Sequence, residues 1–391
     1  MTDLVYLDHA ASTPMRPEAI AAMLPYLADH PANPSGGHDA SRAAKTALEA
    51  ARENVADVLG CRPDEVVFTG SGSESDNLAV KGAAWAARAR GAGEGAVVSA
   101  IEHKAVLGAA HRLEAEGHHV CEVLATASGA VDLERLRTAL DGAGAHVAVV
   151  SVMTVNNETG TEQPLADVAT IVHDRAPNAV LHTDAVQAPQ WVDLARHAAS
   201  GFDLVSLSGH KFGGPKGVGV LVRRNGVELT PLVEGGGHEW SLRAGTQNVA
   251  GIVALATALR VTHHQRAEEC ARIAGLRDRL EAGVIDRIGG VVVNGDRNRR
   301  VAGVLHVAIE GVEAETLLVA LDAVGVCAAS GSACSSGAIE PSHVLLAMGM
   351  DPVRARASIR MSLGWASTDA DIDAAIERIP AVVHRLRERA A

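Results

Sequence analysis

A lysine between two short apolar segments is the first residue of this chain that could do covalent chemistry. Residues 204–207 lead into the tetrapeptide Ser-Gly-His-Lys, which ends at Lys211, and a glycine-rich stretch then leads into residues 218–222. Two rigid strands would fix the position of the amine, and partial removal from water favours its nucleophilic form. Lys211 is therefore a candidate for forming a Schiff base. A solvated lysine in a hairpin loop is the alternative, so the assignment depends on the rest of the chain.

A carboxylate follows another apolar segment upstream of this lysine. Asp184 comes after residues 179–182, and Gln187 lies close behind it. A carboxylate at the carboxyl end of a strand faces the crevice where such sheets bind ligands. Beside a pyridoxal cofactor, Asp184 would pair with the pyridinium nitrogen and keep it protonated, and Gln187 could donate to the ring oxygen. A helix cap or a turn is the alternative for Asp184.

A turn rich in glycine and serine, at residues 70–77, is suited to a phosphate. It follows the apolar residues 66–69, contains Gly72 and Ser73, and opens a helix. Glycines free backbone N–H groups, Ser73 adds a hydroxyl, and the start of a helix favours a bound anion. A glycine turn with a serine helix cap fits the same residues.

Two further polar residues follow strand-like segments. His103 comes after residues 96–100, and its imidazole could stack on a flat ring and move protons near neutral pH. Asn157 comes after residues 147–152, and its amide could bind the ring oxygen. Both also fit structural roles, His103 at the start of a helix and Asn157 in a turn.

The C-terminal third carries a candidate nucleophile and a candidate anion-binding residue. Cys334 lies within nine small residues, 329–337, which favour an exposed loop where a thiol can ionise and attack. Arg360 lies in a short apolar segment, and its guanidinium can bind the carboxylate of an amino acid through two hydrogen bonds. An internal salt bridge is the alternative for Arg360. The other four cysteines are expected to be inert, and their spacing predicts no metal site.

The elements that must position these residues alternate along the chain. Strands are predicted by apolar, β-branched segments at 66–69, 96–99, 147–152, 179–182, 204–207 and 218–222. Helices are predicted at 41–59, 75–89, 103–116, 165–175 and about 251–288. Most strand segments are continuous apolar runs, which predict a mainly parallel sheet covered on both faces. Further strands are expected at 301–309 and 325–328, and we place the domain boundary near residue 260.

Composition and charge exclude several classes of protein. The 391 residues are 47% hydrophobic and 21% charged, as in an ordinary globular protein. A net charge of −12 argues against a nucleic-acid partner. No apolar stretch reaches the length of a membrane span, and no signal peptide is visible at the N-terminus. Five scattered cysteines indicate a reducing compartment, so we expect a cytoplasmic protein.

Taken together, these residues resemble the NifS/IscS-type cysteine desulfurases, which are class V members of the fold-type-I pyridoxal-phosphate enzymes. The resemblance begins at residues 6–14 (Tyr-Leu-Asp-His-Ala-Ala-Ser-Thr-Pro) and extends through residues 33–35 (Asn-Pro-Ser) to Arg360. It implies an α/β fold-type-I transferase. Its large domain, at 15–260, would hold pyridoxal 5′-phosphate on a mainly parallel sheet flanked by helices. A smaller α+β domain, made of 1–14 and 261–391, would carry the cysteine loop.

The resemblance also implies a role for each residue around the cofactor ring. Lys211 would form the Schiff base, and Asp184 would pair with the ring nitrogen. His103 would stack on the ring and take part in catalysis. Asn157 and Gln187 would bind the oxygen side of the ring.

The phosphate of the cofactor would be held by a second group of residues. Within one subunit the resemblance implies Gly72, Ser73, Ser208 and His210. Thr246 would come from the partner subunit, which implies a homodimer.

The resemblance finally implies a reaction. Arg360 and Asn157 would hold the carboxylate of L-cysteine, and Cys334 would attack its sulfur and become a persulfide, leaving alanine. The sulfur would pass to an acceptor protein, either an iron–sulfur scaffold or a thiolation enzyme. The alternatives are a selenocysteine lyase, another class V enzyme such as an aminotransferase, or a catalytically silent scaffold. The loop thiol of Cys334 favours the desulfurase over an aminotransferase.

Overall fold

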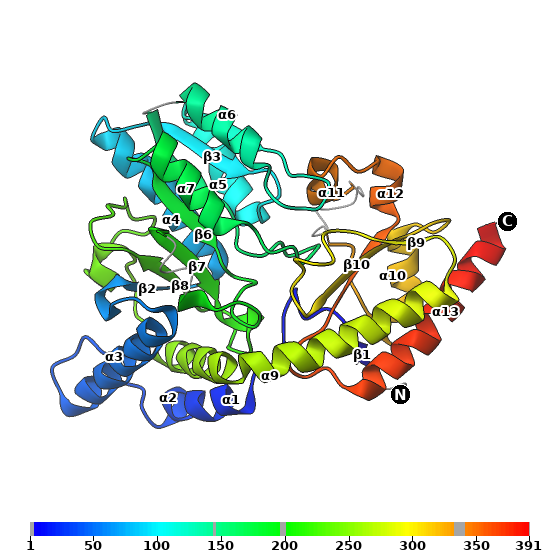
Figure 1. The fold of residues 1–391 in the computed structure, drawn as a ribbon. Helices are drawn as coiled ribbons and strands as arrows, with labels where there is room; N and C mark the ends of the chain where they lie inside the picture. Colours follow the sequence, from blue (N-terminus) through cyan, green and yellow to red (C-terminus); the bar gives the residue numbers. More distant parts are fainter. Residues whose placement is uncertain (1–3, 144–145, 196–200, 332–340, 391) are drawn as a thin grey trace.

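The computed structural model describes residues 4–390 apart from 144–145, 196–200 and 332–340. Figure 1 shows a larger part built around one sheet and a smaller part that contains both ends of the chain. Helix α9 (Val249–Arg287) runs from one part to the other without interruption. No helix in these ranges is both long and apolar enough to cross a membrane.

A sheet of seven strands forms the centre of the larger part. Its order is β2-β8-β7-β6-β5-β3-β4, and only β8 runs against its neighbours β2 and β7 among these described strands. The strands are β2 (Val66–Thr69), β3 (Gly95–Ser99), β4 (His119–Val123), β5 (Val147–Ser151), β6 (Val180–Asp184), β7 (Leu204–Ser208) and β8 (Gly219–Arg223). The predicted α/β class with a mainly parallel sheet is confirmed.

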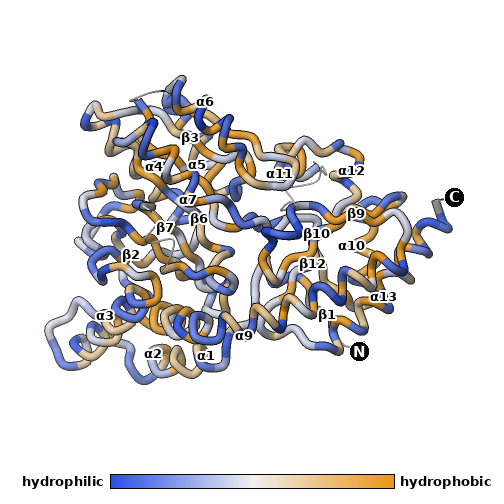
Figure 2. The backbone as a smooth tube through the Cα atoms, in the orientation of Figure 1, coloured by the Kyte–Doolittle hydropathy of each residue, from blue (hydrophilic) through white to orange (hydrophobic). Residues whose placement is uncertain are grey.

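Apolar side chains on both faces of this sheet explain why its strands read as continuous hydrophobic runs. In β2, Val66 and Phe68 pack into one core while Val67 packs into another on the opposite face. In β3, Val97 and Val98 divide in the same way. Successive strand residues point to opposite faces, so a sheet that is covered by helices on both faces needs apolar residues at nearly every position. Figure 2 shows the hydrophobic segments gathered in these strands and on the inner faces of the helices.

Helices cover both faces of the sheet. On one face lie α4 (Gly72–Ala89) and α5 (Lys104–Ala115), which share a core with the sheet. The helices that contribute to the core on the other face include α3 (Asp39–Leu59), α7 (Leu165–Arg175) and the first half of α9. Among the described residues, the larger part also contains α1 (Pro17–Met23), α2 (Pro25–Ala28) and α6 (Leu133–Ala143).

The smaller part has its own hydrophobic core and two small sheets. An antiparallel sheet has the order β12 (Ser358–Ser362), β10 (Val304–Ile309) and β9 (Val291–Val293). Strand β1 (Val5–Tyr6) pairs in parallel with β11 (Val326–Cys327). The helices here are α10 (Ala314–Asp322), α11 (His343–Ala347), α12 (Pro352–Arg356) and α13 (Asp369–Ala390). The predicted domain limits stay a prediction, because α9 is continuous across residue 260.

Candidate active site

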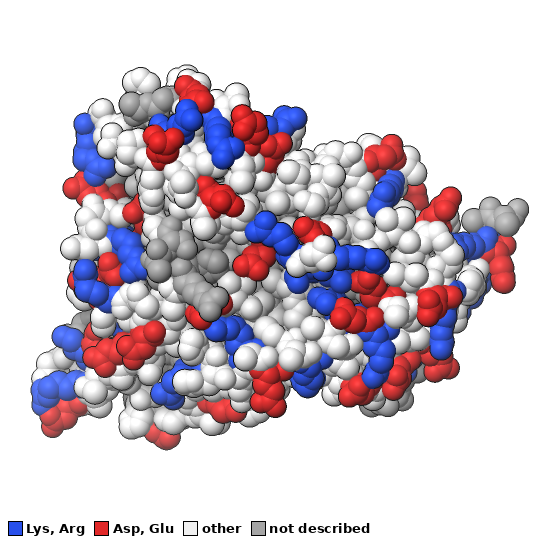
Figure 3. All heavy atoms as spheres, in the orientation of Figure 1, with Lys and Arg blue, Asp and Glu red and all other residues white. Residues whose placement is uncertain are grey.

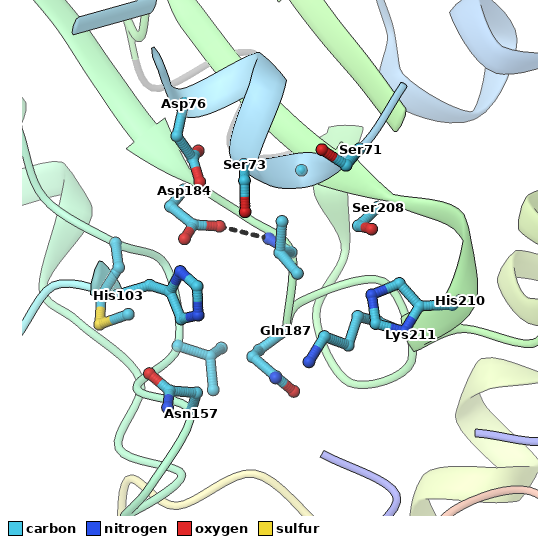
Figure 4. Close-up of a pocket in the computed structure, with 14 residues that line it drawn as sticks. Ser71, Ser73, Asp76, His103, Asn157, Asp184, Gln187, Ser208, His210 and Lys211 are labelled. Atoms are coloured by element: carbon cyan, nitrogen blue, oxygen red, sulfur yellow. Dashed lines mark hydrogen bonds between the residues drawn. The ribbon is translucent and has the colours of Figure 1, made fainter. Parts of the chain in front are cut away.

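A cavity lies where the parallel strands of the central sheet end at their carboxyl side (Figure 4). It is lined by Ser71, Gly72, Ser73, Asp76, His103, Met153, Val155, Asn157, Asp184, Val186, Gln187, Ser208, His210 and Lys211. Every cofactor residue expected from one subunit therefore lines one cavity, although these residues span 140 positions of sequence, from 72 to 211 inclusive. Thr246 and Arg360 are not among the lining residues.

Lys211 projects its amine into this cavity from a short turn. The turn is the 3-10 helix η3 (Gly209–Lys211), which directly follows β7. A side chain on Gly209 would bring its Cβ within 2.9 Å of the Pro215 carbonyl oxygen, so only glycine fits there. The Lys211 Nζ donates to the carbonyl oxygens of Ala10, at 2.6 Å, and Ala11, at 3.0 Å. Desolvation, aided by the positive charge of Arg360, lowers the pKa of Lys211 to about 8, which favours the nucleophilic form near neutral pH.

Asp184 and His103 face each other across the cavity (Figure 4). Asp184 is the last residue of β6, and its Oδ1 accepts from the backbone N–H of Val186 at 2.9 Å. Burial raises the pKa of Asp184, whereas the field of His103 lowers it. His103 precedes α5, and its Nδ1 accepts from the N–H of Ala105 at 3.2 Å. Desolvation lowers the pKa of His103, which favours a neutral ring.

The opposite end of the cavity is suited to an anion. Ser71 caps α4 by accepting from the N–H of Glu74 at 3.1 Å, so the cap predicted as an alternative exists and leaves the Ser73 hydroxyl to the cavity. A Cβ on Gly72 would lie 2.8 Å from Val186 Cγ2 and 3.0 Å from Ser208 Cβ. The helix start is therefore held close to the sheet, with its first N–H groups beside the Ser73 and Ser208 hydroxyls.

His210 and Gln187 line the same cavity as the lysine. The Nδ1 of His210 lies 3.3 Å from the Ser12 Oγ, and desolvation followed by the charge of Lys211 lowers the pKa of His210 to about 4. The Gln187 Nε2 donates to the Ala10 carbonyl at 2.8 Å. The segment from Ala10 to Ser12 does not line the cavity, but it contacts the Lys211, Gln187 and His210 side chains that do.

Arg360 forms an internal salt bridge, which was the alternative to substrate binding in the sequence analysis. Its Nη2 lies 2.7 Å from Asp8 Oδ1, and its Nη1 donates to the Asn157 carbonyl oxygen at 2.8 Å. The second contact places the guanidinium next to the residue with which it is predicted to share the substrate carboxylate. Backbone hydrogen bonds in both directions also join Arg360 to Ala329.

Two predicted residues are not part of the geometry described above, each for a different reason. Cys334 lies outside the described residues, in the range 332–340. Thr246 is exposed and away from the cavity. Burial raises the pKa of Cys61 to about 12 and raises that of Cys327, in agreement with the expectation that these thiols are inert.

Sequence reasoning missed Asp8 and Asp76 as functional candidates. Asp8 belongs to the N-terminal motif, but nothing in its spacing indicated an ion pair with a residue near the C-terminus. Asp76 lines the cavity and is 1% exposed. The sequence did hold a signal for Asp76, because it precedes the apolar residues 78–80 within the predicted helix at 75–89.

Comparisons with known proteins agree with this geometry. The model of the family described as aminotransferase class-V matches residues 5–375. An IscS-like cysteine desulfurase from Mycobacterium tuberculosis is 45% identical over 390 residues, which cover 99% of this chain and 98% of that protein. A cysteine desulfurase from Gluconacetobacter diazotrophicus is 41% identical over 387 residues, covering 98% of this chain and 94% of that protein.

Solved structures give the same result. A NifS-like protein superposes with a TM-score of 0.91 at 32% identity, covering 98% of this chain and all of the other. A structure described as SspA in complex with cysteine superposes with a TM-score of 0.80 at 33% identity, covering 92% of this chain and 98% of the other.

Proposed function

We propose that the cavity described above binds pyridoxal 5′-phosphate and is the place where sulfur is removed from L-cysteine. The proposal proceeds from the finding that this chain belongs to the class-V aminotransferase family and is a cysteine desulfurase. The observation that carries the proposal is the arrangement of Lys211, Asp184 and His103 around one cavity. These are an amine with a lowered pKa, a buried carboxylate and a flat ring, which are the groups that a pyridoxal ring needs.

The residues present fit the cofactor at its phosphate end as well. Gly72 lies so close to Val186 and Ser208 that a Cβ would fill the space beside the helix start. Gly72, Ser73, Ser208 and His210 would hold the phosphate in one subunit, and Thr246 would be contributed by the partner subunit of a homodimer. When bound, the cofactor supplies an electron sink for bonds at the substrate's α-carbon.

The protein's own groups then have separate tasks. Lys211 would attach the cofactor and later move a proton, since its pKa of about 8 lets it both donate and accept near neutral pH. Asp184 would keep the ring nitrogen protonated, with Asn157 and Gln187 on the oxygen side of the ring. His103 would stack on the ring and move a second proton.

Arg360 would orient the substrate through its carboxylate. It already holds Asp8 at 2.7 Å, so the guanidinium is placed to bind a carboxylate group. Asn157 would share this task. Cys334 would attack the substrate sulfur, so that L-cysteine and the Cys334 thiol become L-alanine and a Cys334 persulfide, with no external oxidant or reductant needed. An acceptor protein, either an iron–sulfur scaffold or a thiolation enzyme, would then take the sulfur.

The test is sulfide and alanine production from L-cysteine in the presence of a thiol reductant. We expect Lys211→Ala and Cys334→Ala to lose this activity, while the matched control Cys327→Ala keeps it, because burial raises the pKa of the Cys327 thiol. Unchanged sulfide release by Cys334→Ala would rule out the persulfide step. A wild-type chain that binds no pyridoxal phosphate would indicate a silent scaffold, and a strong preference for selenocysteine would indicate a lyase.

A further inference from the structure

We propose that Asp76 is a positioning residue that carries a proton beside Asp184, so that Asp184 holds the single negative charge of the pair. The inference rests on the proposed function, in which Asp184 pairs with the ring nitrogen of the cofactor. Such a pairing requires an ionised Asp184, and a second ionised carboxylate beside it would raise the energy of that state.

The position of Asp76 is the first observation. It lies in the second turn of α4 and points toward Asp184, as Figure 4 shows. One carboxylate oxygen of Asp76, one carboxylate oxygen of Asp184 and one ring nitrogen of His103 all lie within 4.8 Å of one another. The Asp76 side chain is 1% exposed, and its Oδ1 has no hydrogen-bond partner among the described residues. A buried oxygen without a donor is costly as part of a charged carboxylate, and a proton on it removes that charge.

A buried chain of hydrogen bonds below the cavity supplies the second observation. Ser151 Oγ lies 2.8 Å from His182 Nδ1, and His182 Nε2 lies 3.0 Å from Ser206 Oγ. Ser206 in turn hydrogen-bonds the Asp76 side chain. If Ser206 donates to Asp76, it accepts from His182 Nε2–H, and Ser151 then donates to Nδ1, so each group donates once. This chain satisfies one Asp76 oxygen and leaves Oδ1 for a proton.

The groups around the two carboxylates decide which of them keeps the charge. Asp184 accepts a backbone hydrogen bond and faces Lys211 and His103, whose fields lower its pKa. Asp76 faces Asp184 and the buried carboxyl of Glu102, and both raise its pKa after desolvation. The hydrogen bond from Ser206 lowers the pKa of Asp76, but desolvation and the charge of Asp184 outweigh it, so the neutral form of Asp76 is favoured.

His182 gives Asp76 no countercharge. Its Nε2 lies 3.7 Å from Asp76 Oδ1, but complete burial lowers the pKa of His182 to about 3. The imidazole is therefore neutral near neutral pH. It serves as a hydrogen-bond link between Ser151 and Ser206, and it leaves the proton on Asp76.

The first test uses the full chain without cofactor and needs no activity. A carboxyl whose pKa is raised on folding makes the folded state less stable as pH rises above the pKa of the unfolded chain. We expect the thermal midpoint of Asp76→Asn, relative to wild type, to increase steadily from pH 5 to pH 8. Glu65→Gln is the control with no slope in this range, because hydrogen bonds and Arg224 outweigh desolvation and lower the pKa of Glu65, so that its carboxylate is already ionised at pH 5. An Asp76→Asn midpoint lowered equally at every pH would overturn the proposal.

The second test locates the proton in the cofactor-loaded protein by spectroscopy. If Asp76 is already neutral, Asp76→Asn should move the pH midpoint of the cofactor absorbance by less than about one unit, because no charge is removed. A downward shift of about 1–3 units, the effect of losing a nearby carboxylate charge, would overturn the proposal. The variant Asp184→Asn distinguishes a failure of the Asp76 proposal from a failure of the proposed function. If Asp184→Asn leaves the spectrum unchanged, the proposed function itself fails at this residue.

Discussion

The Lys211 amine is held by two backbone carbonyls, and this has a consequence for its titration. Its pKa of about 8 lies below the ordinary value of 10.5 because burial disfavours the charged form. Between these values the unfolded chain binds a proton that the folded chain has released. This group therefore reduces stability at pH below about 8, and the penalty disappears as pH rises toward 10.5.

We predict that acylation of Lys211 in the cofactor-free chain increases with pH around a midpoint near 8. Only the neutral amine reacts, so the rate follows deprotonation. Mass spectrometry of Lys211 peptides after brief labelling gives the profile, and the urea-denatured chain is the control, with a midpoint near 10.5. Identical profiles in the folded and denatured chains would contradict the prediction.

Arg360 gives a second prediction at the level of a single residue. Lysine keeps the charge of arginine but cannot form two parallel hydrogen bonds to a carboxylate. We expect Arg360→Lys to raise KM for L-cysteine by about 10–100-fold, in line with the loss of a charged hydrogen bond. Arg356→Lys is the matched control, because Arg356 is exposed on α12. Equal KM values for the two variants would show that Arg360 serves only its ion pair with Asp8.

At the scale of the element, the start of α4 depends on a glycine. A methyl group at Gly72 would meet Val186 and Ser208 at 3.0 Å or less, so the helix start would move away from the sheet. Gly108 is the contrast, because a Cβ there has no atom within 4 Å among the described residues and the position is exposed in α5.

We predict that Gly72→Ala weakens pyridoxal-phosphate binding, measured by absorbance titration, and lowers the thermal midpoint. Gly108→Ala should instead stabilise the protein by about 0.8–1.0 kcal/mol in urea unfolding, because alanine favours the helix interior. Unaltered cofactor affinity in Gly72→Ala would mean that the phosphate does not depend on this close approach.

The strands and helices that carry the site could be predicted because their sequences are simple. Residues 66–69 and 204–207 each contain three large apolar residues in four, and both are buried strands. Strand β4 was missed because it is only partly buried and its residues alternate irregularly between polar and apolar. The contacts of Asp8 and Asp76 could not be predicted, since they depend on segments brought together only by the fold.

At the scale of the whole molecule, the N-terminal segment joins the smaller part of the protein to the residues around the site. Strand β1 pairs with β11, which places Asp8 against Arg360 and Ala10 against Lys211. The residues that line the cavity all lie between 71 and 211, and the N-terminal segment contacts two of them, Lys211 and Gln187. Over the face shown in Figure 3, acidic and basic side chains are intermixed.

Thr246 extends the argument beyond one chain. It is exposed and outside the cavity, in a segment that follows three residues with positive φ, Glu239, Trp240 and Ser241. Trp240 is 49% exposed. A large exposed aromatic on a strained backbone is typical of a surface that another protein covers, which supports the proposed homodimer.

Mixing two defective variants tests whether Thr246 acts across that dimer. Lys211→Ala should be inactive, and Thr246→Val should bind the cofactor weakly. In a mixed dimer, the Thr246→Val chain supplies Lys211 to one site while its partner supplies the intact Thr246, so that site is complete. After denaturation and refolding together at equal amounts, half of the dimers are mixed, and about a quarter of the wild-type activity should return. Each variant refolded alone is the control. If no activity returns although mixed dimers form, Thr246 serves the site of its own chain.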